Sequence, residues 1–311
     1  TLAPDALLRE ADALAGGLPG GGARFCGFAG APEGRLLPPA ERPEEVPQGA
    51  KTDLLLSAEE AALSFDPRIR AYAGIYRDAT SEVLVANSDG VLAADLRQSL
   101  TLYQQAAAGS GDGLLSGAQV LVAEQASDLL VTGAHEEDAR EAARAALARL
   151  EFKSVPSGAC PVVFAPGAAG PLLHEALGHA FEGDYVADGS SPFAGRLGER
   201  VAPPGVTLGD GASDTPRRCC AECDDEGTPP VRAVLVEDGI LRGFLPDRAT
   251  APALGLALTG HARRESFRFP PLPRMRALFL APGAEAPEEM LRPVEFGLYV
   301  LKTSGGPVEI P

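Results

Sequence analysis

The sequence predicts an α+β fold, in which an N-terminal α/β layer with an antiparallel meander precedes a mostly antiparallel β domain that carries one short histidine-containing helix. Two observations support this prediction. Strand-like segments joined by a tight turn lead into a long helical pattern, and short apolar runs separated by turn residues follow it. Apolar residues make up 45% of the 311 residues, so the chain can bury a sizeable core.

The chain divides by composition into three expected regions. Residues 1–50 begin with an amphipathic helix and continue as a Pro/Gly-rich linker. This helix lacks the basic start and apolar centre of a signal peptide. Residues 51–152 are expected to form an N-terminal α+β domain, and residues 153–311 a second domain that carries the histidine helix.

Two helices are predicted between residues 51 and 152. Ser57 and Glu60 have the spacing of a capping box, which predicts a short helix that starts there and runs through Phe65. Residues 134–151 form a stronger pattern, with acids in the first turn and arginines in the second half. That distribution complements the helix dipole, so we expect a stable helix.

Strands are predicted between these two helices. The segments 69–79 and 81–87 are strand-like, and the Asn-Ser-Asp-Gly sequence at 87–90 predicts a turn into a strand at 91–96. Residues 100–106 can pair onto the same meander. The expected product is a small sheet with the second helix packed against it.

The region after residue 153 is predicted to be mostly β structure. Pro171 suits the first turn of a helix, and Asp238-Gly239 suits the turn of a hairpin. A strand start near Pro311 has no partner after it, so we expect the core sheet to continue past that residue. The expected elements are strands at 161–164, 275–281 and 294–302, a hairpin at 231–245, and helices at 171–181 and 286–292.

Charge and cysteine content narrow the possible functions. The formal net charge is −16, and such a field repels phosphate backbones, so we expect no nucleic-acid binding. No run of 18 or more apolar residues occurs, which predicts no membrane span. Five cysteines, an odd number, do not suggest a disulfide framework, and a reducing, cytoplasmic setting fits best.

The main functional candidate is the hexapeptide from His174 to His179, which holds two of the four histidines. Side chains at i and i+5 differ by about 140° around a regular helix, so both imidazoles cannot reach one metal without a distortion. A π-bulge would correct the spacing, and Gly178 is the natural place for the backbone to yield. The spacing therefore predicts a local distortion between Ala176 and His179.

Paired histidines with an acid between them suggest hydrolytic metal chemistry. We expect His174 and His179 to be metal ligands, and Glu175 to be the base that takes a proton from a metal-bound water and passes it to the leaving amine. The alternative is that both histidines cap the helix or fill the core around it. The placement of Glu175 between them favours the metal site.

Further polar residues have weaker signals. Glu182 and Asp184 are expected to hydrogen-bond the ring N–H groups of the ligand histidines. His261 is expected to support the site or lie on the surface, and His135, at a helix start, to be exposed. The remaining candidates are Arg263, Arg264 and Ser266, which could bind a peptide carboxylate or carbonyl, and Cys219, Cys220 and Cys223, which are expected to be incidental thiols.

Several blocks of the sequence resemble the TldD branch of the TldD/PmbA metallopeptidases. The block PLLHEALGHAFEGD at 171–184 is similar to that family's H-E-A-x-G-H-x-x-E-G-D motif. Further similar blocks occur in the family's order. They are TSEVLVANSDGVLAADLR, DDEGT, VEDGILRGFLPDR, TGHARRESFRFPPLPRM and FGLYVLKTSGGPVEI.

The resemblance implies a cytoplasmic zinc peptidase that cleaves short, unfolded or modified peptides. His174 and His179 match the family's Zn²⁺ ligands, and Glu175 matches its catalytic glutamate. The family's third ligand is a cysteine in a C-terminal segment, which we expect beyond Pro311. The resemblance also implies a homodimer or a heterodimer with a homologous subunit. Two rivals remain: an inactive partner subunit that scaffolds an active homologue, and a binding module in which this helix is only core.

Overall fold

The computed structural model describes residues 43–87, 89–109, 113–123, 133–153, 158–165, 167–211 and 223–303. The chain forms two compact units. Of the described residues, those within 43–83 and 96–158 belong to the meander unit, and those within 84–95 and 159–303 belong to the C-terminal unit. Helices combine with mostly antiparallel sheets, so the predicted α+β class is confirmed.

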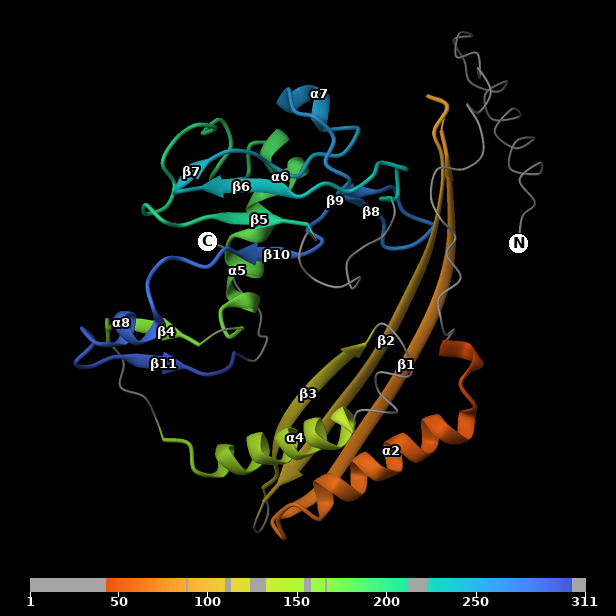
Figure 1. Cartoon of the computed structure of the whole chain (residues 1–311), viewed down its shortest axis with the longest axis vertical. Coiled ribbons are helices and arrows are strands. Elements are labelled where there is room, and N and C mark those ends of the chain that lie inside the picture. Colours follow the sequence, from red (N-terminus) through yellow and green to blue (C-terminus); the bar gives the residue numbers. More distant parts are fainter. Residues whose placement is uncertain are drawn as a thin grey trace. The chain divides into compact units, whose positions relative to one another are not determined.

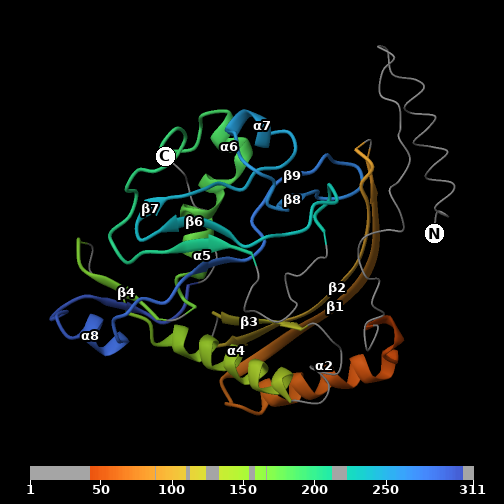
Figure 2. The ribbon, with the colours of Figure 1, turned by 45° about the horizontal axis from the view of Figure 1, so that its top comes forward.

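The meander unit is a three-stranded sheet covered by two helices on one face (Figures 1 and 2). The strands β1 (Ile69–Ala86), β2 (Leu92–Ala108) and β3 (Leu115–Ala123) lie in that order, and β2 and β3 are antiparallel. The helices are α2 (Gln48–Leu63) and α4 (Ala134–Leu150), and a short 3₁₀ helix, η1 (Pro43–Glu45), precedes α2.

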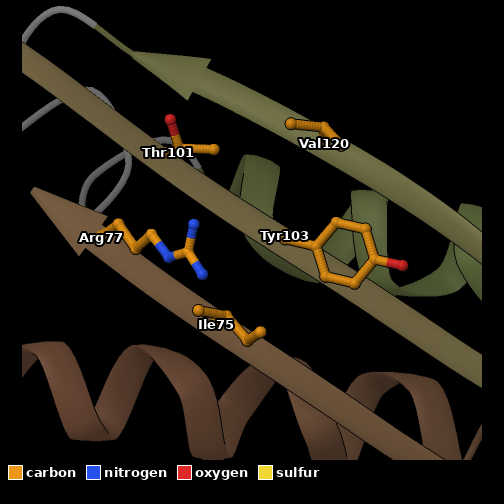
Figure 3. A pocket seen from close by; sticks show the side chains of 5 residues that line it. All are labelled: Ile75, Arg77, Thr101, Tyr103 and Val120. Carbon is orange, nitrogen blue, oxygen red and sulfur yellow. The ribbon is translucent and has the colours of Figure 1, made fainter.

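Alternation along β2 gives the sheet a helix-facing side and an open side. Leu100 and Leu102 are fully buried and pack with Leu54 of α2. Thr101 and Tyr103 point the other way, because successive side chains of a strand alternate. The open side has a pocket lined by Ile75, Arg77, Thr101, Tyr103 and Val120 (Figure 3). None of these lining residues is an acid, histidine or cysteine, so the pocket offers no metal donors.

The C-terminal unit is built on a four-stranded sheet in the order β10-β5-β6-β7, with neighbours antiparallel. Asp238 and Gly239 have φ angles of 48° and 78°, and both positive values suit the tight turn between β6 and β7, so the predicted hairpin is confirmed. The strands are β5 (Leu208–Asp210), β6 (Ala233–Glu237), β7 (Ile240–Leu241) and β10 (Leu278–Leu280).

Helices α5 (Gly170–Ala176) and α6 (Gly183–Ala187) lie on one face of this sheet (Figures 1 and 2). Phe181 and Val186 are buried with Leu235 and Leu245 in one apolar cluster, which fixes the chain around α6 against the sheet. The remaining elements are β4 (Val162–Phe164), η2 (Gly178–Phe181), α7 (Ala251–Leu254), β8 (Ala262–Arg263), β9 (Leu272–Pro273), α8 (Pro287–Leu291) and β11 (Leu298–Val300). β4 pairs with β11 in parallel, and β8 pairs with β9 antiparallel.

Three local predictions were wrong. The helix predicted to start at Ser57 begins at Gln48 instead, and Ser57 lies inside it and donates to the carbonyl of Leu54. The two strands expected at 69–79 and 81–87 are one continuous strand. His135 is buried, not exposed, and its Nε2 lies 2.9 Å from the hydroxyl oxygen of Ser57, because α2 packs against α4 at that point.

Candidate metal centre

The two motif histidines lie on different helical segments. Helix α5, with Pro171 in its first turn, ends at Ala176, and the 3₁₀ helix η2 begins at Gly178. Leu177 joins them with φ −123° and ψ −42°, which is outside the helical range. The predicted distortion is therefore confirmed. Its form differs from the expected π-bulge, because the chain changes from α to 3₁₀ geometry.

This break brings the motif side chains together. The ring centroids of His174 and His179 are 4.9 Å apart, with the ring planes at 84°. One potential ligand atom from each of His174, Glu175 and His179 lies within 4.8 Å of the others. In the part of the chain that the structure describes, no other group of three such residues was found. Two imidazoles and a carboxylate are a donor set that suits zinc.

Gly178 lies close to the side chains of Met275 and Leu278. A Cβ atom at this position would overlap the sulfur of Met275, and it would lie 3.1 Å from Cδ2 of Leu278. A larger residue would therefore require the side chains of Met275 and Leu278 to shift. The prediction that the backbone yields at Gly178 was wrong by one residue, because the non-helical torsions are at Leu177 and Gly178 begins η2.

Glu182 supports His179 from the protein interior. The Glu182 side chain is fully buried, and its Oε2 lies 3.0 Å from Nδ1 of His179. A carboxylate accepts hydrogen bonds, so this contact places the proton on Nδ1 and leaves Nε2 free to bind a metal. The backbone N–H of Met275 donates to Oε1 of Glu182 over 3.2 Å. The expected support of a histidine by Glu182 agrees with this contact.

Arg274 is a charged neighbour that the sequence did not reveal. Its Nη1 donates to Oε2 of Glu182 over 3.2 Å and to Oδ2 of Asp184 over 3.0 Å. Asp184 therefore contacts this arginine, where a histidine partner was expected. Burial of Arg274 lowers its pKa, but the hydrogen bond to Asp184 and the charges of Glu182 and Asp184 outweigh burial, so the pKa is raised.

The other histidines and arginines of interest lie outside the three-residue group. His261 is buried, with Nε2 2.9 Å from Oδ1 of Asp210 and Nδ1 2.8 Å from the hydroxyl of Thr259, so a surface position is excluded. Arg263 is exposed on β8. Arg264 donates its backbone N–H to Oδ2 of Asp225 over 2.7 Å.

The thiols are only partly described. Cys223 is buried, while Cys219 and Cys220 lie outside the described residues. Among the residues whose positions are described, no cysteine joins the group around His174.

Two family models cover most of the chain. Residues 41–150 match the PmbA/TldA metallopeptidase central domain, and residues 157–310 match the PmbA/TldA metallopeptidase C-terminal domain. The chain is 34% identical over 269 residues to a metalloprotease TldD homolog of Buchnera aphidicola, with 84% of this chain and 55% of the relative covered. A TldD homolog of Haemophilus influenzae is 34% identical over 280 residues, with 86% and 56% covered.

Solved structures share the fold. A Thermotoga maritima structure, named as a candidate modulator of a DNA gyrase, superposes with a TM-score of 0.74 at 25% identity and covers 91% of this chain and 63% of its own. TldE from Thermococcus kodakarensis superposes with a TM-score of 0.64 at 22% identity, with 82% and 57% covered. The chain thus spans a little over half the length of the curated relatives. In the described residues, no helix is long and apolar enough to cross a membrane.

Proposed function

Because the chain belongs to the PmbA/TldD metallopeptidase family, we propose that it carries the zinc-binding half-site of a peptidase that hydrolyses short, unfolded or modified peptides. His174 and His179 are the proposed ligands, and Glu175 is the proposed general base. The observation that supports this assignment best is the convergence of these three side chains within 4.8 Å at the break between α5 and η2.

The surroundings of the histidines support a ligand role over a core role. His174 is exposed, and the side chain of His179 is 33% exposed. Histidines that merely fill a core would be excluded from solvent, with both ring nitrogens bonded internally. Instead, within the described residues, Nδ1 of His179 is the one ring nitrogen of this pair with a hydrogen-bond partner, Glu182, which orients the ring and leaves the outward nitrogen available.

The proposed reaction is hydrolysis of a peptide bond by water. Zinc bound at this site would act as a Lewis acid toward the water and the peptide carbonyl. Glu175, exposed beside both histidines, takes a proton from the attacking water as the oxygen bonds to the carbonyl carbon. The C–N bond then breaks, and Glu175 passes the proton to the leaving amine nitrogen, so the acid–base group is restored.

A second subunit is part of the proposal. The chain is related in sequence to proteins named TldD homologs, and it shares a fold with a structure named TldE. We infer that it assembles as a homodimer or as a heterodimer with a homologous subunit. A role as an inactive, scaffolding subunit is favoured by one observation: apart from Glu175, which is assigned as the base, the described residues supply no third ligand beside His174 and His179. The intact His-Glu-His group favours the active role.

The test is the metal content and peptidase activity of His174→Ala. Because His174 is exposed, its loss should leave the fold intact while zinc and activity are both lost. Leu172→Ala is the matched control, since Leu172 is 43% exposed on the same helix and offers no donor. Its zinc content should equal that of the wild type. Retained zinc in His174→Ala would contradict the ligand assignment.

A further inference from the structure

We propose that Arg274 is a positioning residue for the metal centre, which it serves by holding Glu182 in place behind His179. This inference rests on the proposed function, because it concerns a ligand of the same site. The side chain of Arg274 donates to Glu182 and Asp184, so it acts on the metal site through Glu182.

The contacts form a continuous chain from the strand pair β8–β9 to the site. The backbone N–H of Arg274 donates to the carbonyl of His261 over 2.8 Å, which anchors the arginine to the residue directly before β8. Its Nη1 reaches Oε2 of Glu182, and that same oxygen lies 3.0 Å from Nδ1 of His179. Arg274 and the proposed ligand His179 are thus linked through one oxygen, Oε2 of Glu182.

Glu182 needs this cation because its carboxylate is fully buried. A buried carboxylate is costly unless it is paired with a charge and hydrogen-bonded. The N–H of Met275 serves Oε1, while Arg274 and His179 share Oε2. Of these three partners, only Arg274 is a permanent cation. Its removal would leave the carboxylate without that charge and would release the orientation of the His179 ring.

Asp184 helps to fix the position of the Arg274 side chain. Asp184 lies in the first turn of α6, which follows η2 after the extended residue Glu182, and it accepts from the same Nη1 atom that serves Glu182. The arginine is therefore held from both sides, with its side chain 24% exposed. Because one nitrogen makes both contacts, an ammonium group at the same place can replace it, whereas an apolar side chain cannot.

The experiment compares Zn²⁺ affinity in Arg274→Met, Arg274→Lys and wild type, measured by competition with chelators of graded strength. Loss of a residue that orients a ligand typically costs about 10–100-fold in metal affinity, so Arg274→Met should weaken binding by that order. Arg274→Lys should restore most of the affinity. Arg242→Met is the matched control, because Arg242 forms an exposed pair with Glu237 and its loss changes the net charge equally. The control should bind Zn²⁺ as the wild type does.

A spectroscopic measurement separates positioning from a general loss of stability. The visible absorption of bound Co²⁺ reports the geometry of its ligands, so it should change in Arg274→Met and return toward wild type in Arg274→Lys. Wild-type Zn²⁺ affinity in a folded Arg274→Met protein would overturn the proposal. If that variant does not fold, Asp184→Asn provides the test, because it removes a carboxylate that accepts from Arg274. Zn²⁺ affinity should then fall as well. Unchanged affinity would overturn the proposal.

Failure of this inference differs from failure of the proposed function. If His174→Ala removes Zn²⁺ binding while Arg274→Met leaves it unchanged, the metal site stands and the role of Arg274 is wrong. If His174→Ala leaves Zn²⁺ binding unchanged, the metal site itself is wrong.

Discussion

Glu175 is the residue on which the proposed chemistry depends most directly. It is exposed beside the two histidines, and its proposed role is to move a proton. Glu175→Gln keeps the size of the side chain but removes the base, so peptidase turnover should fall about 10²–10⁴-fold while zinc content stays unchanged. Turnover on a peptide substrate and metal content, measured on the same preparation, check this prediction.

The control for Glu175 is Glu199→Gln, which removes one carboxylate from an exposed pair with Arg196. Its turnover should match the wild type. Full turnover in Glu175→Gln would move the base to another residue, and Glu182 would be considered next, although its burial and its three partners make it a weak proton carrier.

In the meander unit, helix α4 packs closely against strand β3. Gly117 of β3 lies directly against the backbone of α4, and a Cβ there would overlap the carbonyl oxygen of Ala142 and the amide nitrogen of Ala146. Ala142 and Ala146 are themselves fully buried. Small residues on both sides therefore let the helix approach the sheet closely.

This close approach predicts a cost for one added methyl group. Gly117→Ala must push α4 away from β3, and overpacking of this kind typically lowers the free energy of unfolding by about 1–3 kcal/mol. Gly49→Ala is the control, because Gly49 lies in α2 with no atom within 4 Å of the added Cβ. It should be neutral or stabilising by about 0.5–1 kcal/mol. Denaturant unfolding measures the free energy of unfolding of both variants. Equal values for Gly117→Ala and Gly49→Ala would contradict the packing argument.

The helices of the meander unit show where the local sequence was sufficient to predict an element's bounds and where it was not. The helix expected at 134–151 is observed as α4, because its acidic first turn and arginine-rich second half are strong local signals. The start of α2 was missed. Pro47 precedes it and no side chain caps it, so nothing in the local pattern marks Gln48. Packing against the sheet and α4 stabilises the extra turns instead.

For the whole chain, the number of available ligands predicts how tightly zinc binds. Catalytic zinc usually takes three protein ligands, and the described residues bring together two histidines with one glutamate that is assigned as the base. The 311-residue chain should therefore bind zinc more weakly than a complete three-ligand site. Occupancy measured against a competing chelator checks this. Tight, stoichiometric zinc would mean that a further donor lies within the chain.

If zinc is tight, single replacements identify that donor. Cys219 and Cys220 would be replaced first, because His261 is already bonded through both ring nitrogens and Cys223 is buried. A variant that loses zinc while keeping its far-ultraviolet circular dichroism would identify the missing ligand.

Features that depend on near neighbours along the chain could be predicted from local sequence patterns. The i, i+5 histidine spacing required a break in the helix, because residues that far apart cannot share a helical face, and the structure has that break at Leu177. Asp238-Gly239 determined the hairpin because few other residues adopt two positive φ angles in succession. The α+β class followed from the same local periodicities.

The contacts that support the candidate site depend instead on long-range packing. Arg274 lies 92 residues from Glu182, and an isolated arginine after a proline carries no local signal of that contact. The burial of His135 likewise depends on α2 packing against α4, 78 residues away from Ser57. Such contacts are set by which apolar surfaces bury one another, a balance summed over the whole unit, so short sequence patterns do not encode them.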